Sequence, residues 1–325
     1  MFGKKAAAHG KPEVHPGGLT RDHVVWAYRL LLDRDPENED VIAPKLAGSR
    51  DTRELRHHLM TSGEFREKNP DYAHANDRTI VIKELDGPDG PVRLFVDLAD
   101  HAIGLNIVRG RYEAEAINFV RRWVRPGDVA IDAGAHIGFF TMQLAASVGA
   151  SGHVYAFEPF DAAAELLERS IEENRFAGRV TVRRAAVGSA SGTATLTFPV
   201  ETLNSGGAYV LRGGTQPLSG NLQKSVPALA LDDLDLRRPV RFIKMDVEGA
   251  EPQVVRGAAR LLAEDRPVIL SEIHPTQLER ASGATAQEFL DYMRSIRYRA
   301  QDLEGRPIQG APEDVIASVV LMPRD

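Results

Sequence analysis

The segment from Asp128 to Gly138, with the sequence DVAIDAGAHIG, constrains the fold more than any other part of this chain. It begins as an apolar run typical of a buried strand, and Gly134 and Gly138 then predict a tight turn into a helix. A second apolar run, His153–Phe157, ends in Glu158. A strand, a glycine turn, a helix and an acid at the tip of the next strand are how open α/β sheets bind a nucleoside.

Composition narrows the classes of protein that fit. The chain has 325 residues, of which 43% are hydrophobic, enough for two domains with a sizeable core. Its net charge of −6 gives no support for nucleic acid as the main partner. The absence of cysteine excludes disulfides, thiolate catalysis and cysteine metal sites. The sequence shows no signal peptide and no apolar run of ~18 residues that could span a membrane, so we expect a cytoplasmic protein.

Three regions are expected along the chain. Residues 1–18 are rich in Gly, Ala, Pro and Lys and predict a disordered N-terminus. Residues 19–76 predict a small helical domain, which begins at an N-cap at Thr20. Residues 77–325 predict the larger domain, which opens with a β-hairpin and an amphipathic helix. The hairpin strands are expected at 79–85 and 92–98, the amphipathic helix at 112–123, and the helices of the small domain at 20–32, 41–47 and 52–60.

From residue 128 onward strands and helices alternate, which is typical of a parallel, doubly wound α/β sheet. The expected strands cover 128–133, 153–158, 179–184, 240–246 and 266–273, followed by late strands at 296–302 and 315–322. The expected helices cover 137–148, 161–175, 250–263 and 285–295. The glycine-rich segment 201–223 shows no periodicity, and we interpret it as a long loop that either closes over a substrate or lies on the surface.

The glycine turn indicates which nucleoside is bound. NAD-binding turns read G-x-G-x-x-G, in which the second glycine lets a pyrophosphate approach the helix. Here three other residues separate Gly134 from Gly138, which favours S-adenosylmethionine (SAM), a cofactor without a pyrophosphate. Glu158 is suited to accept two hydrogen bonds from the ribose. The expected cofactor-binding residues are Asp132, Gly134, Ala135, His136, Gly138, Glu158, Pro159, Ala186 and Asp246.

A second group of polar residues follows the expected strand at 240–246. Alternation places Lys244, Asp246 and Glu248 on the same side of that strand, with Asp246 at its tip. Ligands of open parallel sheets bind beyond the strand tips, so Asp132, Glu158, Asp246 and Glu272 are expected to meet at one edge. Glu248 and Glu251 also suit a helix N-terminus, where the helix dipole stabilises a carboxylate, and the sequence leaves both roles open.

These segments resemble the FkbM family of SAM-dependent methyltransferases. The matching segments are 131–138, 156–159, Asn174, 185–188, 204–207, 231–234 and 243–251. The resemblance covers roughly residues 110–275 and implies a class I methyltransferase fold, SAM as the methyl donor and, usually, a hydroxyl acceptor in a sugar or natural product. The family often has Asn where His136 stands.

The helical region carries a shorter resemblance. Residues 28–36 (YRLLLDRDP) and 62–65 (SGEF) are similar to a small helical domain that recurs beside enzymes of surface-polysaccharide and glycan metabolism. By association alone, this favours a glycan or small-molecule acceptor.

Methyl transfer to a hydroxyl group requires alignment, exclusion of water and a general base. Asp246, held by Lys244, is the first candidate for the base, followed by Glu272 and His274. Candidates for contact with the acceptor are Asn204, Ser205 and Glu248, with Tyr112, Phe139, Phe140 and Tyr209 as aromatic contacts. We expect no metal, because no ligand spacing such as H-E-x-x-H is present.

Two other functions stay open at this point. An NAD-dependent sugar oxidoreductase or epimerase would share the fold, but it needs a pyrophosphate-binding turn. A non-catalytic glycan-binding scaffold would act through the helical domain, but the intact set of acids at the strand tips argues against it. A homo-oligomer is compatible with the sequence.

Overall fold

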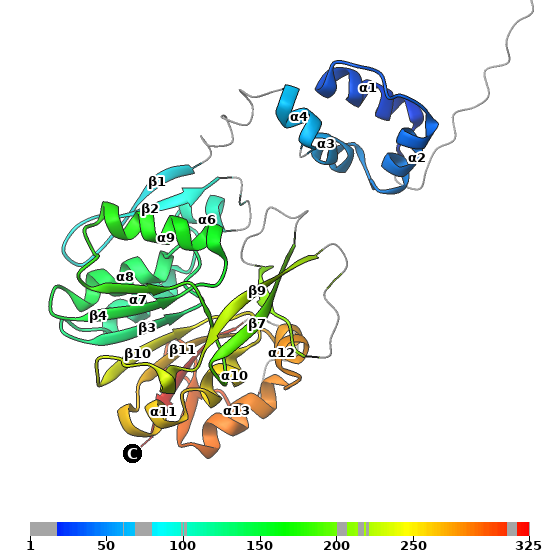
Figure 1. The fold of residues 1–325 in the computed structure, drawn as a ribbon. Helices are drawn as coiled ribbons and strands as arrows, with labels where there is room; N and C mark the ends of the chain where they lie inside the picture. Colours follow the sequence, from blue (N-terminus) through cyan, green and yellow to red (C-terminus); the bar gives the residue numbers. More distant parts are fainter. Residues whose placement is uncertain are drawn as a thin grey trace, which may run out of the picture. The chain divides into compact units, whose positions relative to one another are not determined.

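The structure is a computed structural model, and it describes residues 18–60, 62–68, 80–98, 100, 103–199, 207–213, 218, 221–310 and 317–324. The chain divides into two compact units, residues 1–79 and 80–325 (Figure 1). Residues 1–18 are predicted to be disordered, and all of them except Gly18 lie outside the described residues. The predicted domain boundary at 76–77 also lies outside them and stays a prediction.

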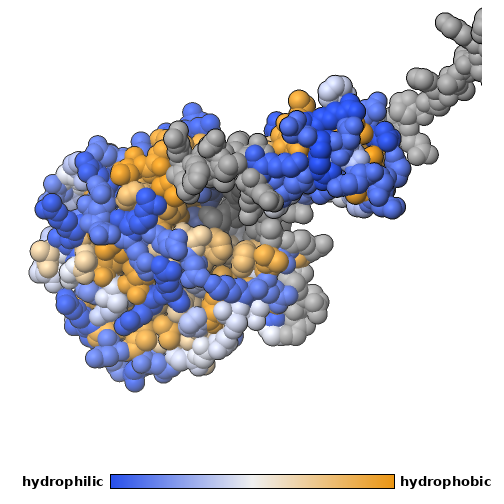
Figure 2. Space-filling view, turned by 45° about the horizontal axis from the view of Figure 1, so that its top comes forward, coloured by the Kyte–Doolittle hydropathy of each residue, from blue (hydrophilic) through white to orange (hydrophobic). Residues whose placement is uncertain are grey.

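The described residues of the first unit form four helices, three at the positions that the helical spacing predicts and a fourth, short one after them. Their bounds are α1 (Arg21–Leu32), α2 (Glu39–Ala47), α3 (Thr52–Met60) and α4 (Gly63–Lys68). Val24, Tyr28 and Leu32 of α1 are buried against Leu55 and Leu59 of α3. On the face drawn in Figure 2, hydrophilic residues cover most of this unit.

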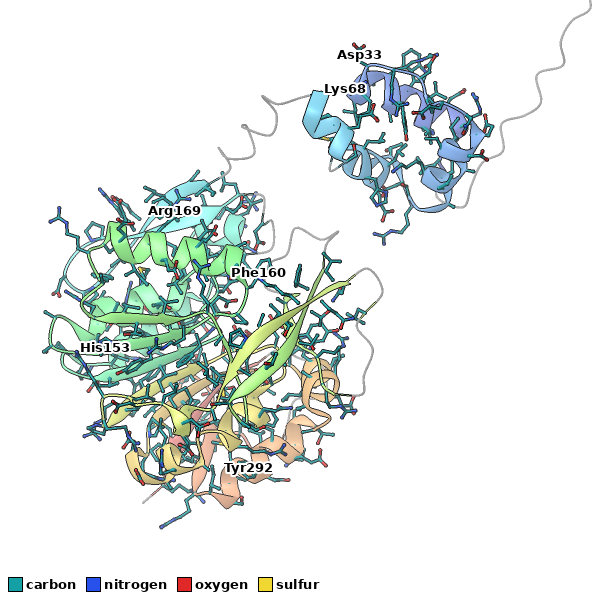
Figure 3. All side chains as sticks on the ribbon, viewed as in Figure 1. Asp33, Lys68, His153, Phe160, Arg169 and Tyr292 are labelled. Carbon is teal, nitrogen blue, oxygen red and sulfur yellow. The ribbon has the colours of Figure 1, made fainter. Side chains whose placement is uncertain are left out.

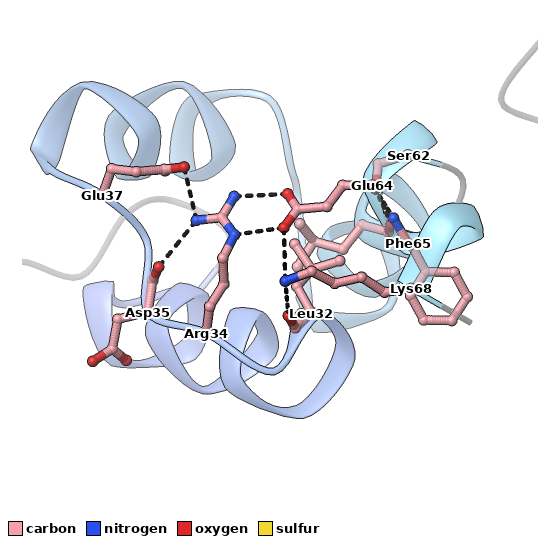
Figure 4. Close-up of polar contacts among 9 residues, drawn as sticks. Leu32, Arg34, Asp35, Glu37, Ser62, Glu64, Phe65 and Lys68 are labelled. Atoms are coloured by element: carbon pink, nitrogen blue, oxygen red, sulfur yellow. Dashed lines mark hydrogen bonds and ion pairs between the residues drawn. The ribbon is translucent and has the colours of Figure 1, made fainter. Parts of the chain in front are cut away.

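One polar cluster joins the segment that follows α1 to α4 (Figure 4). The Arg34 guanidinium donates two hydrogen bonds to the Glu64 carboxylate, at 2.5 and 2.7 Å, and also pairs with Glu37 at 2.9 Å. Lys68 Nζ donates to the carbonyl of Leu32 at 2.7 Å. The two segments that carry the shorter resemblance, 28–36 and 62–65, are thus joined by a bidentate ion pair.

The described residues of the second unit form a central sheet of seven strands in the order β12-β13-β11-β10-β3-β4-β5. The bounds are β3 (Val129–Ala133), β4 (His153–Phe157), β5 (Val180–Arg183), β10 (Val240–Met245), β11 (Val268–Ile273), β12 (Tyr298–Gln301) and β13 (Ala317–Pro323). Strands β5, β4, β3, β10 and β11 are parallel, and β13 runs antiparallel between β11 and β12. This order, with one reversed strand near an edge, is that of the class I methyltransferase fold, so the predicted α/β fold class is confirmed.

Helices cover both faces of this sheet, which explains why all residues of β3 and β4 are buried. One core contains Phe119 of α7 (Ala114–Trp123), Leu144 of α8 (Phe139–Val148) and Leu167 of α9 (Asp161–Glu173). The other core contains residues of four helices: α10 (Glu251–Arg256), α11 (Ala259–Asp265), α12 (Pro275–Ser282) and α13 (Ala286–Ser295). The predicted helix at 250–263 is therefore two helices, α10 and α11, and α12 was not predicted.

The predicted hairpin is confirmed as β1 (Ile80–Leu85) and β2 (Val92–Asp97), and the short helix α6 (Gly104–Val108) follows it. Asn174, at the end of α9, accepts a hydrogen bond from the Arg93 N–H at 2.8 Å and donates to the Arg93 carbonyl at 2.6 Å. This residue of the family resemblance therefore fixes the hairpin to the α/β layer.

The prediction that 201–223 lacks regular structure is wrong for 209–210 and 221–223, which are strand residues, whereas 211–213 are irregular as predicted. A smaller sheet has the order β6-β9-β7-β8, with bounds β6 (Ala186–Val187), β7 (Gly192–Pro199), β8 (Tyr209–Val210) and β9 (Asn221–Leu229). Strand β8 and the start of β9 fall inside the expected loop, because both pair with β7 over long range. Phe160, labelled in Figure 3, anchors this sheet by contact with Phe198 of β7, with ring centroids 5.2 Å apart.

No helix among the described residues is both long and apolar enough to cross a membrane.

Gly134 follows the end of β3 and lies against the backbone of Asp246, which follows the end of β10. Its φ is +81°, and a Cβ atom there would stand 1.7 Å from the backbone oxygen of Asp246. We expect Gly134→Ala to destabilise the second unit by roughly 2–5 kcal/mol, because left-handed strain of ~1–2 kcal/mol adds to an overlap that costs ~1–3 kcal/mol.

The control is Gly110→Ala, which has φ +67° and no atom within 4 Å of the added Cβ, and it should lose only the strain part. The two tryptophans of the sequence, Trp26 and Trp123, lie one in each unit. Urea unfolding followed by Trp123 fluorescence in a Trp26→Phe background measures the second unit. Equal losses for the two alanine variants would contradict the packing argument.

Candidate functional site

A cavity of about 460 Å³ lies beyond the carboxyl ends of β3, β4, β10 and β11. The chain leaves β3 toward β4 on one side and later returns to β10 on the other, so the cavity sits at the switch point of the sheet. Many of the residues predicted from the sequence line it. They are Gly134, Ala135, His136, Glu158, Pro159, Ala186, Lys244, Asp246, Glu248, Glu272 and His274.

Two predicted residues do not line the cavity but lie behind it. Asp132 is fully buried, and its Oδ2 accepts a hydrogen bond of 2.6 Å from the hydroxyl of Thr141. Gly138 has φ +95° at the start of α8, where a Cβ would meet the Leu167 side chain of α9 at 2.6 Å. Asn204 and Ser205 lie outside the described residues.

The backbone of the glycine turn is bound to the neighbouring strand. The N–H groups of Gly134 and Ala135 both donate to the carbonyl of Phe157, at 3.0 and 2.9 Å. The N–H of His136, which has φ 51°, donates to Glu158 Oε2 at 2.8 Å. The first N–H groups of this turn are therefore already used within the protein.

Glu158 is held in one position at the tip of β4. Its other oxygen, Oε1, accepts a hydrogen bond of 2.7 Å from the Phe160 N–H. Burial raises the pKa of Glu158 to about 7, against the effect of these two hydrogen bonds. Because each carboxylate oxygen has two lone pairs, both can still accept a bond from a diol. The site therefore fits the ribose of a nucleoside.

Lys244 is a buried cation at the centre of the site. Its Nζ lies 3.1 Å from Asp246 Oδ2, 3.3 Å from the Gly134 carbonyl and 4.9 Å from the centre of the Phe140 ring. Burial acts to lower the pKa of Lys244, but the carboxylates of Asp246 and Asp132 outweigh it and raise that pKa. Lys244 therefore stays charged and joins the ends of β3 and β10.

Further carboxyl groups surround this ion pair. Glu248 follows β10 in a left-handed conformation with φ 55°, and Glu272 lies on β11. Burial, followed by repulsion from Asp246, raises the pKa of both carboxyls. Glu113, with φ 49° at the start of α7, lines the same cavity, and burial raises its pKa too. Sequence reasoning missed Glu113, because it precedes a helix and does not end a strand.

Glu251 has a different role from Glu248. It begins α10, and its Oε1 accepts hydrogen bonds from the N–H groups of Val247 and Gly249, at 3.1 and 3.4 Å. It is buried and does not line the cavity, and burial raises its pKa to about 7. The helix N-terminal role is thus confirmed for Glu251, whereas Glu248 faces the cavity.

His136 is also enclosed, and burial lowers its pKa to about 4, so its imidazole is neutral at pH 7. The four aromatic residues considered from the sequence all line the cavity, and they are Tyr112, Phe139, Phe140 and Tyr209. Tyr112 and Phe139 pack edge to face, with centroids 5.0 Å apart. The smaller sheet supplies Tyr209 from β8 and Leu196 from β7. Among the described residues no group of three His, Asp or Glu side chains is arranged to hold a metal ion.

Comparison with known proteins decides the family. The family model described as the methyltransferase FkbM domain matches residues 132–300, more than half of the chain. The chain belongs to the FkbM methyltransferase family. It is therefore a SAM-dependent methyltransferase, and S-adenosylmethionine is its cofactor. No curated protein sequence matches the chain.

Solved structures resemble this FkbM methyltransferase only distantly. A methyltransferase FkbM from Methylobacillus flagellatus is 18% identical, with a TM-score of 0.41, over 92% of this chain and 58% of that one. The chain thus matches less than two thirds of the length of that relative. A putative rRNA methylase from Clostridium thermocellum is 13% identical, with a TM-score of 0.41, over 65% and 95% of the two chains. A SAM-dependent O-methyltransferase from Thermotoga maritima is 14% identical, with a TM-score of 0.38, over 74% and 77%.

The raised carboxyl pKa values predict how stability depends on pH. An unfolded glutamate titrates near ~4.3, so between that pH and about 7 the folded chain binds more protons at Glu251 than the unfolded chain does. The free energy of unfolding should therefore fall as pH rises from 5 to 8 without ligand. Glu251→Gln should reduce the total fall in the free energy of unfolding between pH 5 and pH 8 by an amount on the order of 2 kcal/mol.

The matched control is Glu165→Gln, on the exposed face of α9, which should leave the slope unchanged. Urea unfolding at several pH values, followed by Trp123 fluorescence, measures both variants. Parallel curves for wild type and Glu251→Gln would show that Glu251 is ionised in the folded protein at low pH.

Proposed function

We propose that this methyltransferase transfers the methyl group of SAM to a hydroxyl group of a sugar, a glycan or a related natural product. The observation that carries the proposal is that one cavity holds both Glu158, at the tip of β4, and the ion pair of Lys244 with Asp246, at the tip of β10. Glu158 can hold a nucleoside, and Asp246 of the ion pair can act as a base. The shorter resemblance of the helical region supports a glycan acceptor by association.

In this proposal the donor occupies the half of the cavity formed by the β3 turn and the tip of β4. Glu158 accepts hydrogen bonds from the ribose hydroxyls, and the remaining contacts come from Gly134, Ala135, His136, Pro159 and Ala186. Asp132 and Gly138 act from behind the cavity by shaping the turn. When bound, SAM supplies a methyl group whose bond to sulfur breaks as the acceptor oxygen forms its bond to carbon.

Asp246 is the proposed general base, and it takes the proton of the acceptor hydroxyl. Lys244 fixes its carboxylate at 3.1 Å and so acts as a positioning residue. Glu272 and Glu248 are weaker candidates, because carboxyls with raised pKa values hold protons near pH 7 and cannot accept another. His274 lines the cavity and its Nδ1 has no hydrogen-bond partner among the described residues, so it is the second candidate.

The NAD-dependent alternative is less well supported. A pyrophosphate needs free backbone N–H groups at the helix N-terminus. In this turn the N–H groups of Gly134, Ala135 and His136 already donate to Phe157 and Glu158. The scaffold alternative leaves the ion pair and the acids of the cavity without a role.

Binding measurements separate these functions. We expect SAM and S-adenosylhomocysteine to bind and NAD not to bind in calorimetric titrations. Glu158→Gln should weaken S-adenosylhomocysteine by about tenfold or more, because a hydrogen bond to a charged group contributes ~1.5–3 kcal/mol. Glu165→Gln, exposed on α9, is the control. Tight NAD binding, or unchanged affinity in Glu158→Gln, would overturn the donor site.

Replacement of the base gives the second test. Asp246→Asn keeps the size of the side chain and removes its charge, so turnover should fall ~100-fold or more while donor affinity stays within a few-fold. Asp291→Asn, exposed on α13, should behave as wild type. Transfer of radiolabelled methyl groups to a panel of sugars measures turnover. If Asp246→Asn turns over at the wild-type rate, Asp246 is not the base, and His274 becomes the first candidate.

A further inference from the structure

The part of the cavity away from Glu158 is strongly acidic. Among the described lining residues it carries four carboxyl groups from three elements. Glu113 precedes α7, Asp246 and Glu248 follow β10, and Glu272 lies on β11. Lys244 is the one Lys or Arg side chain among the described residues of the lining.

Neither the protein nor the donor balances these charges. Lys244 pairs with Asp246, whereas Glu113, Glu248 and Glu272 form no ion pair with Lys or Arg among the described residues. The donor brings one net positive charge, since the ammonium and carboxylate of its amino-acid part cancel. If all four carboxyl groups were ionised, these two positive charges would leave a net charge of −2. Glu248 and Glu272 therefore hold protons until a further cation enters the part of the site that must hold the acceptor.

A second observation concerns the wall of the same cavity. Tyr209 lines the cavity from β8 and is only 6% exposed, yet its hydroxyl has no hydrogen-bond partner among the described residues. A buried hydroxyl without a partner is costly unless a ligand satisfies it. Among the described residues, the neutral side chain of Gln277 is the polar side-chain partner of the Glu248 carboxyl, and burial, followed by repulsion from Asp246, raises the pKa of that carboxyl.

We propose that the acceptor carries a protonated amino group, as an amino sugar or another amino alcohol does. Glu113, Glu248 and Glu272 bind the ammonium group, while Asp246 receives the proton of the hydroxyl that is methylated. Charge-assisted hydrogen bonds favour such an acceptor, and repulsion by the same carboxylates rejects phosphorylated or carboxylated ones. This inference rests on the proposed function and adds the charge of its acceptor.

Matched pairs of acceptors test the proposal. The probes are the methyl glycosides of glucosamine and galactosamine and their neutral N-acetyl counterparts, titrated at pH 6.5 into the full chain saturated with S-adenosylhomocysteine. At least one amine should bind tenfold or more tightly than its N-acetyl counterpart, and Glu248→Gln and Glu272→Gln should each reduce that preference about tenfold. Glu115→Gln, on the exposed side of α7, is the control.

The alternative is that these acids serve the positive sulfur of the donor. SAM carries that charge and S-adenosylhomocysteine does not, so the ratio of their affinities reports on it. Glu248→Gln and Glu272→Gln variants that change this ratio while the amine preference stays intact would overturn the proposal, as would equal binding of amine and N-acetyl probes by the wild type. Normal binding of S-adenosylhomocysteine in those experiments shows that the variants are folded and that the donor site itself stands.

Discussion

The buried ammonium group of Lys244 is the interaction on which the rest of the site depends. A buried cation is stable only with anionic and hydrogen-bonding partners, and Lys244 has these in Asp246 and the Gly134 carbonyl, with the charge of Asp132 behind them. Because these partners belong to β3 and β10, Lys244 joins the two strands at the point where the sheet changes direction. Gly134 approaches the backbone of Asp246 closely at this junction, where the Asp246 N–H also donates to the carbonyl of Ala133 at 3.0 Å.

The same junction determines which nucleoside the turn can accept. The end of β3 is held against β10, and the glycine turn that follows β3 contacts the end of β4. The N–H groups of this turn donate to Phe157 and Glu158. The helix N-terminus therefore contributes little free hydrogen-bonding capacity, and in the proposed binding mode the carboxylate of Glu158 recognises the nucleoside. That arrangement suits a cofactor with a ribose and no pyrophosphate, in agreement with family membership.

Sequence alone predicted those parts of the site that depend on local patterns. Buried strands read as apolar runs, and the rule that ligands bind beyond parallel strand ends placed Glu158, Asp246 and Glu272 around one cavity. The smaller sheet was missed because β8 has only two residues and owes its pairing to β7, although 193–198 alternate in the manner of a strand. Glu113 was missed because only the tertiary structure brings the start of α7 to the tips of β10 and β11.

The carboxyl groups of the cavity differ in their partners although they are close together. Asp246 has a cation at 3.1 Å, whereas burial, followed by repulsion from Asp246, raises the pKa of Glu248 and of Glu272 and favours their protonated forms. Environments that separate the protonation of neighbouring acids are how one site provides both a proton acceptor and neutral or exchangeable partners. In the proposed mechanism, the ion pair with Lys244 distinguishes Asp246 as the base, and the remaining acids respond to the charge of the proposed acceptor.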